Sequence, residues 1–209
     1  MVTIQTEKCI GCGLCVKDCI LRNLKLEDGK AVAAENCFDC GHCVAICPVN
    51  ACAIPAYPME EVKAYDAASF DLQPDIFLNA VKFRRSIRHF KPQRVEREVL
   101  AEVLEAGRYT ETAVNYQDVR FIVVQDALEE AKELIWEGWR RFCVSLAAED
   151  DPKAGAFLRF YERWKKNPQM DRLFLGAPVM LVIAADVPLD GGLASANLEI
   201  CLLYTSRCV

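Results

Sequence analysis

The feature that most constrains this chain is an eleven-residue cysteine motif that occurs twice near the N-terminus. The sequence CIGCGLCVKDC runs from Cys9 to Cys19, and CFDCGHCVAIC runs from Cys37 to Cys47. Aligned on their first cysteine, the two copies agree at six positions, which are four cysteines, one glycine and one valine. Eight of the 12 cysteines therefore lie in the first 47 of 209 residues. Such a repeat predicts two copies of one small unit that complete each other's core.

Each copy reads C-x2-C-x2-C-x3-C, a spacing typical of iron-sulfur ligation. The first three cysteines wrap a short loop around one cluster, and the fourth leaves on a helix and points to the other cluster. The predicted ligands are Cys9, Cys12, Cys15 and Cys47 for one [4Fe-4S] cluster, and Cys37, Cys40, Cys43 and Cys19 for its partner. Gly13 and Gly41 suit loops that are tight around a cluster, because glycine has no Cβ. Pro48 follows the last cysteine as this pattern prefers, whereas Ile20 replaces the proline in the first copy.

Zinc knuckles and a disulfide scaffold are the alternatives. A zinc site uses two CxxC pairs, so a third cysteine two residues further on has no role in a tetrahedral site. The N-terminus MVTIQTEKCI lacks a basic region followed by an apolar one, which predicts a cytoplasmic protein with reduced thiols. Residues 3–55 resemble bacterial two-cluster ferredoxins. A unit of about 57 residues buries too little surface to fold comfortably without such a metal group.

The overall charge excludes several classes of partner. A net charge of −5 provides no general attraction to nucleic acid or to anionic lipid.

The longest apolar run, from Gly176 to Ala185, is ten residues long and contains Pro178, so it predicts a buried strand rather than a membrane span. No P-loop, GxGxxG or Ser/His/Asp arrangement is present in the sequence.

The chain is predicted to contain two domains of different kinds. We expect a two-cluster ferredoxin domain over 1–57, a linker over 58–74, a second domain over 75–200, and a non-native tail over 201–209. Apolar periodicity predicts helices over 75–86, 94–107, 127–148, 153–167 and from 191 onward. Two very apolar segments, 119–126 and 177–186, predict buried strands. The combination gives an α+β fold.

The ends and faces of two of these helices are predicted from local patterns. Asp75 is expected as the N-cap of the first helix, and Gly107 as the C-terminal stop of the second. The first helix is expected to present one broad apolar face formed by Ile76, Phe77, Ala80, Val81 and Phe83. Cys52 and Cys143 are expected to be small buried hydrophobic residues rather than ligands.

Two polar segments of the second domain are candidates for binding. RRSIRHF, residues 84–90, combines Arg84, Arg85 and Arg88 with Ser86, and guanidinium and hydroxyl groups together bind phosphate. A solvated basic face is the simpler interpretation of these arginines alone. TETAVNYQD, residues 110–118, contains Thr112, Asn115 and Gln117, which can donate to ring carbonyls or ribityl hydroxyls, although alone they would form an ordinary loop.

Together and in this order, these segments resemble the FMN-dependent nitroreductase family over residues 76–200. The resemblance rests on RRSIRHF, on T-x-x-N-x-Q, on GAPVMLVIAAD and on DGGLASANLEI. It implies that Arg84, Arg85, Ser86 and Arg88 hold the FMN phosphate and ribityl chain. It also implies that Asn115 faces the flavin, with Thr112 nearby, and that Arg172 approaches the pyrimidine edge of the ring. The family usually has proline at position 118, where this chain has Asp118.

These expectations combine into one function. Two clusters form a short electron path, and a flavin joins one-electron clusters to two-electron organic chemistry. We expect an oxidoreductase that passes electrons between the clusters and FMN, and on to a small acceptor such as a nitroaromatic or a quinone. The direction of flow is open, as is the electron donor, either a redox protein or a nicotinamide cofactor. The alternative is a non-enzymatic carrier whose second domain only docks to a redox partner.

The end of the sequence predicts an incomplete flavin domain. In the nitroreductase family, further strands and helices follow the DGGLASANLEI helix, complete the flavin pocket and embrace a second subunit of a homodimer. This chain instead ends in CLLYTSRCV, which resembles the translation of a sequencing adapter. We therefore expect an N-terminal fragment with a whole ferredoxin unit, and we give Cys201 and Cys208 no role.

Overall fold

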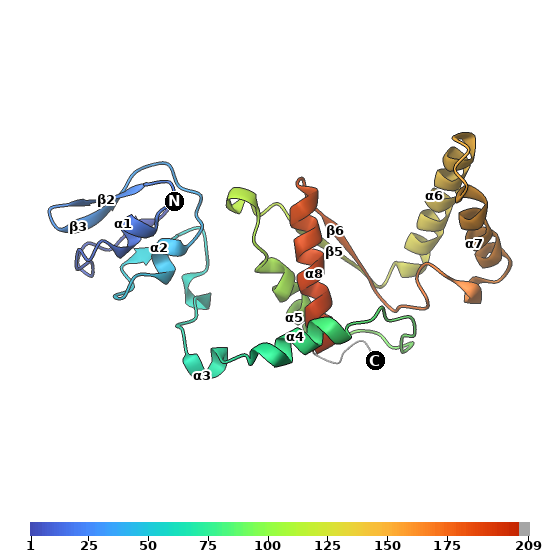
Figure 1. Cartoon of the computed structure of the whole chain (residues 1–209), viewed down its shortest axis with the longest axis horizontal. Helices are drawn as coiled ribbons and strands as arrows, with labels where there is room; N and C mark the ends of the chain where they lie inside the picture. Colours follow the sequence, from blue (N-terminus) through green and yellow to red (C-terminus); the bar gives the residue numbers. More distant parts are fainter. Residues whose placement is uncertain (205–209) are drawn as a thin grey trace. The chain divides into compact units, whose positions relative to one another are not determined.

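The computed structural model describes residues 1–204 and divides the chain into two compact units (Figure 1). Unit 1 comprises Met1–Leu72 together with Thr112–Gln117, and unit 2 comprises Gln73–Glu111 and Asp118–Val209. Unit 1 is therefore assembled from two separate segments of the chain. Of the tail expected over 201–209, residues 201–204 continue a helix, and residues 205–209 lie outside the described residues.

Unit 1 contains short strands and short helices joined by tight turns. Its elements are β1 (Thr3–Ile4), α1 (Leu14–Asp18), β2 (Leu24–Glu27), β3 (Lys30–Ala33), α2 (His42–Ala45), β4 (Cys52–Ala53), η1 (Met59–Glu61), α3 (Ala67–Phe70) and η2 (Ala113–Asn115). Strand β1 pairs antiparallel with β4, and β2 forms a hairpin with β3. The first pairing ties the start of the repeat region to its end.

The core of unit 1 is small. Its buried residues are Val2, Cys9, Cys15, Leu24, Ala31, Ala51, Cys52 and Ile54. Three of them are cysteines and two are alanines, so little hydrocarbon is available to stabilise the fold. A unit with so small a core depends on further stabilisation, such as disulfides or bonds to a metal group.

The segment expected as a linker is exposed along most of its length. Every residue from 61 to 79 is exposed. The segment nevertheless contains η1 and α3, and the carboxylate of Asp66 caps α3 by accepting from the backbone N–H groups of Ala68 and Ser69, both at 3.3 Å. These turns are held by local hydrogen bonds rather than by burial.

Unit 2 mixes longer helices with two strands, which confirms the α+β class. Its elements are α4 (Pro74–Phe83), α5 (Arg97–Arg108), β5 (Arg120–Val124), α6 (Leu128–Ala148), α7 (Ala154–Lys166), η3 (Pro168–Met170), β6 (Met180–Ala184) and α8 (Pro188–Tyr204). Strands β5 and β6 pair antiparallel, from Arg120 opposite Ala184 to Val124 opposite Met180. The helices expected from residues 127 and 153 are present as α6 and α7.

Helix α8 is the central element of unit 2, and it packs on α4, α5 and β6 (Figure 1). Its buried contacts come from Ala194 and Leu198, which are 0% and 3% exposed. Gly107 of α5 is also buried, and a Cβ placed there would lie 3.1 Å from Leu198 Cδ2 and 2.6 Å from Phe121 Cζ of β5. The close approach of α5 to its neighbours therefore requires glycine at position 107.

Helices α6 and α7 form a hairpin held together by aromatic side chains. Trp136 is 1% exposed and stacks on Trp164 with the ring centroids 5.2 Å apart. The indole Nε1 of Trp139 donates to the carbonyl of Phe157 at 3.0 Å. The hydroxyl of Tyr161 donates to Glu137 at 2.5 Å, and this bond lowers the pKa of Glu137 and raises that of Tyr161.

Two predicted helix ends are wrong. Helix α4 begins at Pro74 with Gln73 as its N-cap, so Asp75 lies inside the first turn. Proline at the first helical position removes an N–H that has no partner in the helix, which explains the earlier start. Gly107 lies within α5, which continues to Arg108. Its role is close packing rather than termination.

The apolar side chains of α4 are exposed, and the expected burial of the two strands is wrong in this chain. Ile76, Phe77, Val81 and Phe83 of α4 are 44–75% exposed. Neither β5 nor β6 contains a fully buried residue. An apolar pattern predicts which face of a helix or strand is suited to burial. Whether that face is buried depends on the elements that pack against it.

Replacing two helical glycines by alanine separates these packing effects. Alanine in place of glycine gains about 1 kcal/mol in a helix interior. At Gly138 of α6 no atom lies within 4 Å of the new Cβ, so Gly138→Ala should stabilise unit 2 by about that amount. At Gly107 the same gain is offset by crowding, which costs about 1–3 kcal/mol. The free energy of unfolding of Gly107→Ala should therefore be about 1–3 kcal/mol lower than that of Gly138→Ala. Chemical denaturation of both variants measures it, and equal stabilities would contradict the close packing at Gly107.

Candidate functional site

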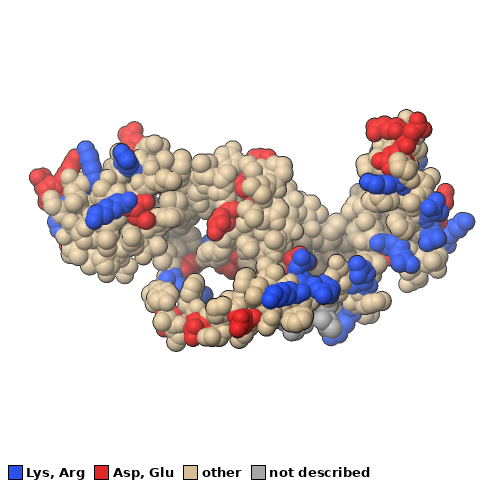
Figure 2. All heavy atoms as spheres, in the orientation of Figure 1, with Lys and Arg blue, Asp and Glu red and all other residues tan. Residues whose placement is uncertain are grey.

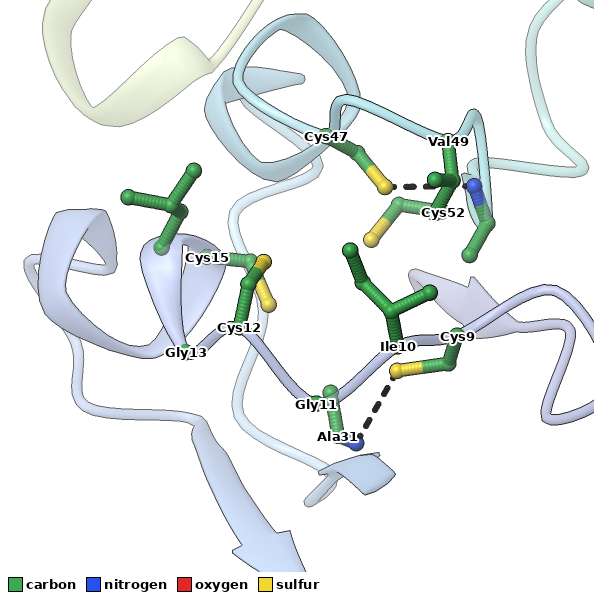
Figure 3. Close-up of a pocket in the computed structure, with 12 residues that line it drawn as sticks. Cys9, Ile10, Gly11, Cys12, Gly13, Cys15, Ala31, Cys47, Val49 and Cys52 are labelled. Carbon is green, nitrogen blue, oxygen red and sulfur yellow. Dashed lines mark hydrogen bonds between the residues drawn. The ribbon is translucent and has the colours of Figure 1, made fainter. Parts of the chain in front are cut away.

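Unit 1 contains two cavities lined by cysteines. The first encloses about 330 Å³ of empty space, part of it open to solvent, and Figure 3 shows its cysteine side chains. Its cysteines are Cys9, Cys12, Cys15, Cys47 and Cys52. The second encloses about 420 Å³, and its cysteines are Cys19, Cys37, Cys40 and Cys43. Each cavity thus receives three cysteines from one motif and the last cysteine of the other.

The lining of the two cavities suits the ligand set of a cluster. Within residues 1–204, no group of three or more His, Cys, Asp or Glu side chains is placed to hold a single metal ion. Ligands of a [4Fe-4S] cluster bind different irons, and the fourth cysteine of each motif serves the other cluster. Cavities that take cysteines from both motifs fit that requirement.

Glycines shape both cysteine loops, and one of them was missed in the sequence. Gly13 and Gly41 cap α1 and α2 in the left-handed conformation, with φ of 71° and 78°. Gly11 has φ of 69°, and a Cβ there would lie 2.1 Å from the carbonyl oxygen of Gly29. Only glycine fits at position 11, because the β2–β3 turn presses against the Cys9–Cys12 loop. Gly29 is distant in sequence, so spacing alone does not reveal this contact.

Backbone N–H groups point at four of the cysteine sulfurs. The donors are Ala31 to Cys9 at 3.4 Å, Asn23 to Cys19 at 3.3 Å, Asp39 to Cys37 at 3.4 Å and Ala51 to Cys47 at 3.2 Å. Two of these bonds are drawn in Figure 3. The bond from Ala31 is the main cause of a lowered pKa at Cys9. At Cys47 burial opposes ionisation, yet the bonds from Ala51 and Val49 leave the pKa lowered. Such bonds favour thiolates, the form that binds iron.

Cys52 is a fifth thiol at the first cavity. It is 5% exposed, as expected for a buried residue, and it lies on β4 opposite Ile4. Figure 3 shows its sulfur beside that of Cys47. A hydrogen bond with Cys43, together with burial, raises the pKa of Cys52, and the same bond lowers the pKa of Cys43 although burial opposes this. Cys52 lies outside both eleven-residue cysteine motifs, which suits a neighbour of the ligands rather than a ligand.

The basic segment expected to bind phosphate follows α4 in unit 2. Figure 2 shows Lys and Arg side chains gathered along this part of the chain. Arg84 forms an ion pair with Glu199 of α8. Arg85 turns back onto the carbonyls of Lys82 and Arg84, at 3.1 and 2.7 Å. Ser86 and Arg88 are exposed, so this segment presents guanidinium and hydroxyl donors to solvent. Such a donor set fits a phosphate group.

Arg172 lies apart from this segment in the sequence, between η3 and β6 of unit 2, and it is exposed. No contact in the structure links it with Arg84, Ser86 or Arg88 among the interactions described. Its assignment to the flavin stays a prediction.

Thr112 and Asn115 belong to unit 1 in the structure. The side-chain amide of Asn115 donates to the carbonyl of Phe38 at 2.7 Å and to the hydroxyl of Tyr57 at 3.2 Å. The hydroxyl of Thr112 accepts from the backbone N–H of Gln117 at 2.9 Å. Phe38 lies between Cys37 and Cys40 and lines the second cavity. Through Asn115, the 112–117 segment is therefore hydrogen-bonded to a cysteine loop.

Asp118, where proline is usual, has a structural role in unit 2. It is 8% exposed, and its Oδ2 accepts from the backbone N–H groups of Asp186 and Val187 at 2.5 and 3.1 Å. These N–H groups lie in the turn between β6 and α8. The carboxylate therefore fixes the start of α8, a task that proline could not perform.

Two family models match this sequence. Residues 81–199, more than half of the chain, match the nitroreductase family, and residues 1–48 match the 4Fe-4S dicluster domain. No curated protein matches the chain. Among the described residues, no helix combines the length and the apolar character needed to cross a membrane.

Several solved structures are similar to the chain. A nitroreductase with bound FMN from Bacteroides fragilis NCTC 9343 is 19% identical with a TM-score of 0.45, and the match covers 62% of this chain and 65% of that one. A BluB-like flavoprotein from Clostridium difficile 630 is 20% identical with a TM-score of 0.47, over 61% and 69% of the two chains. A nitroreductase with bound FMN from Desulfitobacterium hafniense DCB-2 is 27% identical with a TM-score of 0.44, over 62% and 65%. The chain thus spans less than two thirds of the first of these structures.

Two variants distinguish a ligand from its neighbour at the first cavity. Cys47→Ala should lose about half of the bound iron, because a cluster that lacks one of its four thiolates is not retained. Cys52→Ala removes a neighbouring thiol that is more deeply buried, and it should retain all of the iron. Iron and sulfide assays under anaerobic conditions measure both. Loss of iron from Cys52→Ala and its retention in Cys47→Ala would reverse the assignment.

Proposed function

Because this chain belongs to the nitroreductase family over residues 81–199 and begins with a 4Fe-4S dicluster domain, we propose that it is an iron-sulfur flavoprotein oxidoreductase. It passes electrons between two [4Fe-4S] clusters and FMN, and on to a small acceptor such as a nitroaromatic or a quinone. The observation that carries this proposal is the union of both domains in one chain. FMN, when bound, supplies the exchange between one-electron and two-electron chemistry.

The cluster ligands in this proposal are the cysteines of the two cavities other than Cys52. Cys9, Cys12, Cys15 and Cys47 hold one cluster, and Cys37, Cys40, Cys43 and Cys19 hold the other. The lining of the cavities supports this division. The backbone N–H groups of Asn23, Ala31, Asp39 and Ala51 stabilise the ligand sulfurs as thiolates.

The flavin residues in this proposal act by binding and orientation. Arg84, Arg85, Ser86 and Arg88 hold the phosphate and the ribityl chain, since guanidinium groups bind phosphate through two parallel donors. Arg172 approaches the pyrimidine edge of the ring. The exposure of Ser86 and Arg88 supports this role, because both are available to a ligand. No general acid–base pair is required of the protein for electron transfer of this kind.

Thr112 and Asn115 complete the proposed flavin contacts. The Thr112 hydroxyl holds the backbone of Gln117, so it shapes the segment that contains Asn115. The amide of Asn115 bonds to Phe38 in the loop between Cys37 and Cys40. The segment that contains Asn115 therefore contacts the loop between Cys37 and Cys40 within unit 1.

The partners follow from the same proposal. The electron source is a nicotinamide cofactor or a redox protein, and the protein works as a homodimer in the cytoplasm. The second candidate function is a ferredoxin-type carrier whose unit 2 only docks to a redox partner. It is favoured by the completeness of the cysteine cavities within unit 1 alone.

Cofactor content separates the two functions. An anaerobic ultraviolet-visible spectrum with iron, sulfide and FMN assays should show about eight iron and eight sulfide per chain, as two clusters require. The same assays should also show one FMN per chain. Iron without FMN would favour the carrier, and zinc in place of iron would exclude both functions.

A pair of arginine variants tests the phosphate site. Arg88→Ala should weaken FMN binding by about 1.5–3 kcal/mol, since it removes a hydrogen bond to a charged group. Arg94→Ala provides the control, because Arg94 is also exposed but is paired with Asp126. Fluorescence titration of the flavin-free protein with FMN measures both affinities. Equal affinities in Arg88→Ala and Arg94→Ala would remove Arg88 from the site.

A further inference from the structure

The two cysteine motifs are followed by the same turn. After Cys19, the backbone N–H of Arg22 donates to the Cys19 carbonyl at 2.9 Å, and after Cys47, that of Asn50 donates to the Cys47 carbonyl at 3.3 Å. Arg22 and Asn50 have φ of 51° and 50°. The next residue in each copy donates its N–H to the cysteine sulfur, from Asn23 at 3.3 Å and from Ala51 at 3.2 Å. Positions 23 and 51 are therefore equivalent.

The side chains at these equivalent positions differ in chemistry. Ala51 is 1% exposed and carries only a methyl group at the first cavity. Asn23 is 5% exposed and lines the second cavity beside Cys19. Neither its Nδ2 nor its Oδ1 has a hydrogen-bond partner within the described part of the chain. A buried amide without partners costs free energy, and an occupant of this cavity that accepts a hydrogen bond would satisfy Nδ2.

The sulfurs of a [4Fe-4S] cluster and of its thiolate ligands are such acceptors. Hydrogen bonds to these sulfurs stabilise the reduced cluster, which carries the larger negative charge, and so raise its reduction potential. The backbone N–H bonds to Cys19 and Cys47 are equivalent in the two copies, so this pair of bonds does not distinguish the clusters. The Asn23 amide is present at one cavity only.

We infer that the side-chain Nδ2 of Asn23 donates to the cluster held by Cys19, Cys37, Cys40 and Cys43 and raises its reduction potential. This inference rests on the proposed function, since it requires both clusters. One electron given to the pair then rests on the second cluster: the first is oxidised by one electron, the second is reduced by one, and no bond or proton changes. Asn23 is a positioning residue that acts through the ligand set and directs electrons toward the loop of Phe38.

The thiol of Cys52 is a different kind of donor from this amide. It occupies the position equivalent to Leu24, and it lines the first cavity. Its hydrogen bonds involve Cys15 and Cys47 of the first set as well as Cys43 of the second set. A thiol is a weak donor compared with an amide, so we expect the larger effect from Asn23.

Reciprocal variants of the equivalent positions test the inference. In Asn23→Leu, which nearly preserves volume, the midpoint of one cluster should fall while the other stays unchanged. At a fixed potential the ratio of reduced to oxidised second cluster should decrease about tenfold, which corresponds to about 59 mV for one electron. Ala51→Asn installs the missing donor and should raise the midpoint of the first cluster instead. Redox titration of the holoprotein, monitored by electron paramagnetic resonance, measures both midpoints alongside iron content.

The outcomes separate this inference from the proposed function. Unchanged midpoints in Asn23→Leu with a full iron content would overturn the role of Asn23 and leave the oxidoreductase intact. A wild-type protein without iron-sulfur clusters would overturn both. If Asn23→Leu lost iron, Ala51→Asn would decide the matter, because it leaves Asn23 in place. An unchanged first midpoint in that variant would then refute the donor effect.

Discussion

The rest of unit 1 depends on one constraint, which is that each cavity takes cysteines from both motifs. The last cysteine of each motif lines the cavity of the other copy, so neither half can close its site alone. The hydrocarbon core is limited to residues such as Leu24 and Ile54. Metal–sulfur bonds across the repeat would therefore supply much of the folding free energy, and cluster binding and folding are coupled. Gly11 shows how closely the backbone fits, because its loop leaves no room for a Cβ against Gly29.

Unit 2 is stabilised in a different way, by close packing around α8. The small side chains of Gly107 and Ala194 allow α5 and α8 to approach, and the Asp118 carboxylate holds the turn that begins α8. The helix carries the partner of Arg84 as well, since Glu199 lies on it. A shift of α8 would therefore also move one of the guanidinium groups that we assign to phosphate. The fold and the proposed binding segment share this helix.

Sequence patterns predicted the features that depend on local spacing. The cysteine intervals predicted which thiols share a cavity. Apolar periodicity predicted α6 and α7, and Trp136 and Cys143 are buried residues of α6. Features that depend on distant neighbours were not predictable. Gly107 carries the local pattern of a helix stop, but its contact with Phe121 is a tertiary one. Likewise, the roles of Asp118 and Gly11 become visible only once the turn or loop that each one touches is placed beside it.

A repeated fold creates a difficulty for a protein that moves electrons, because identical sites would have equal potentials. The ligands cannot distinguish the two clusters, since both sets contain four cysteines with the same spacing. The matched backbone bonds from Asn23 and Ala51 cannot distinguish them either. Side chains at equivalent positions are one source of a difference, because they diverge between the two copies. Asn23 is equivalent to Ala51, and there a buried amide stands in place of a methyl group. A difference at this position would give the two clusters different reduction potentials and so a preferred direction of electron transfer.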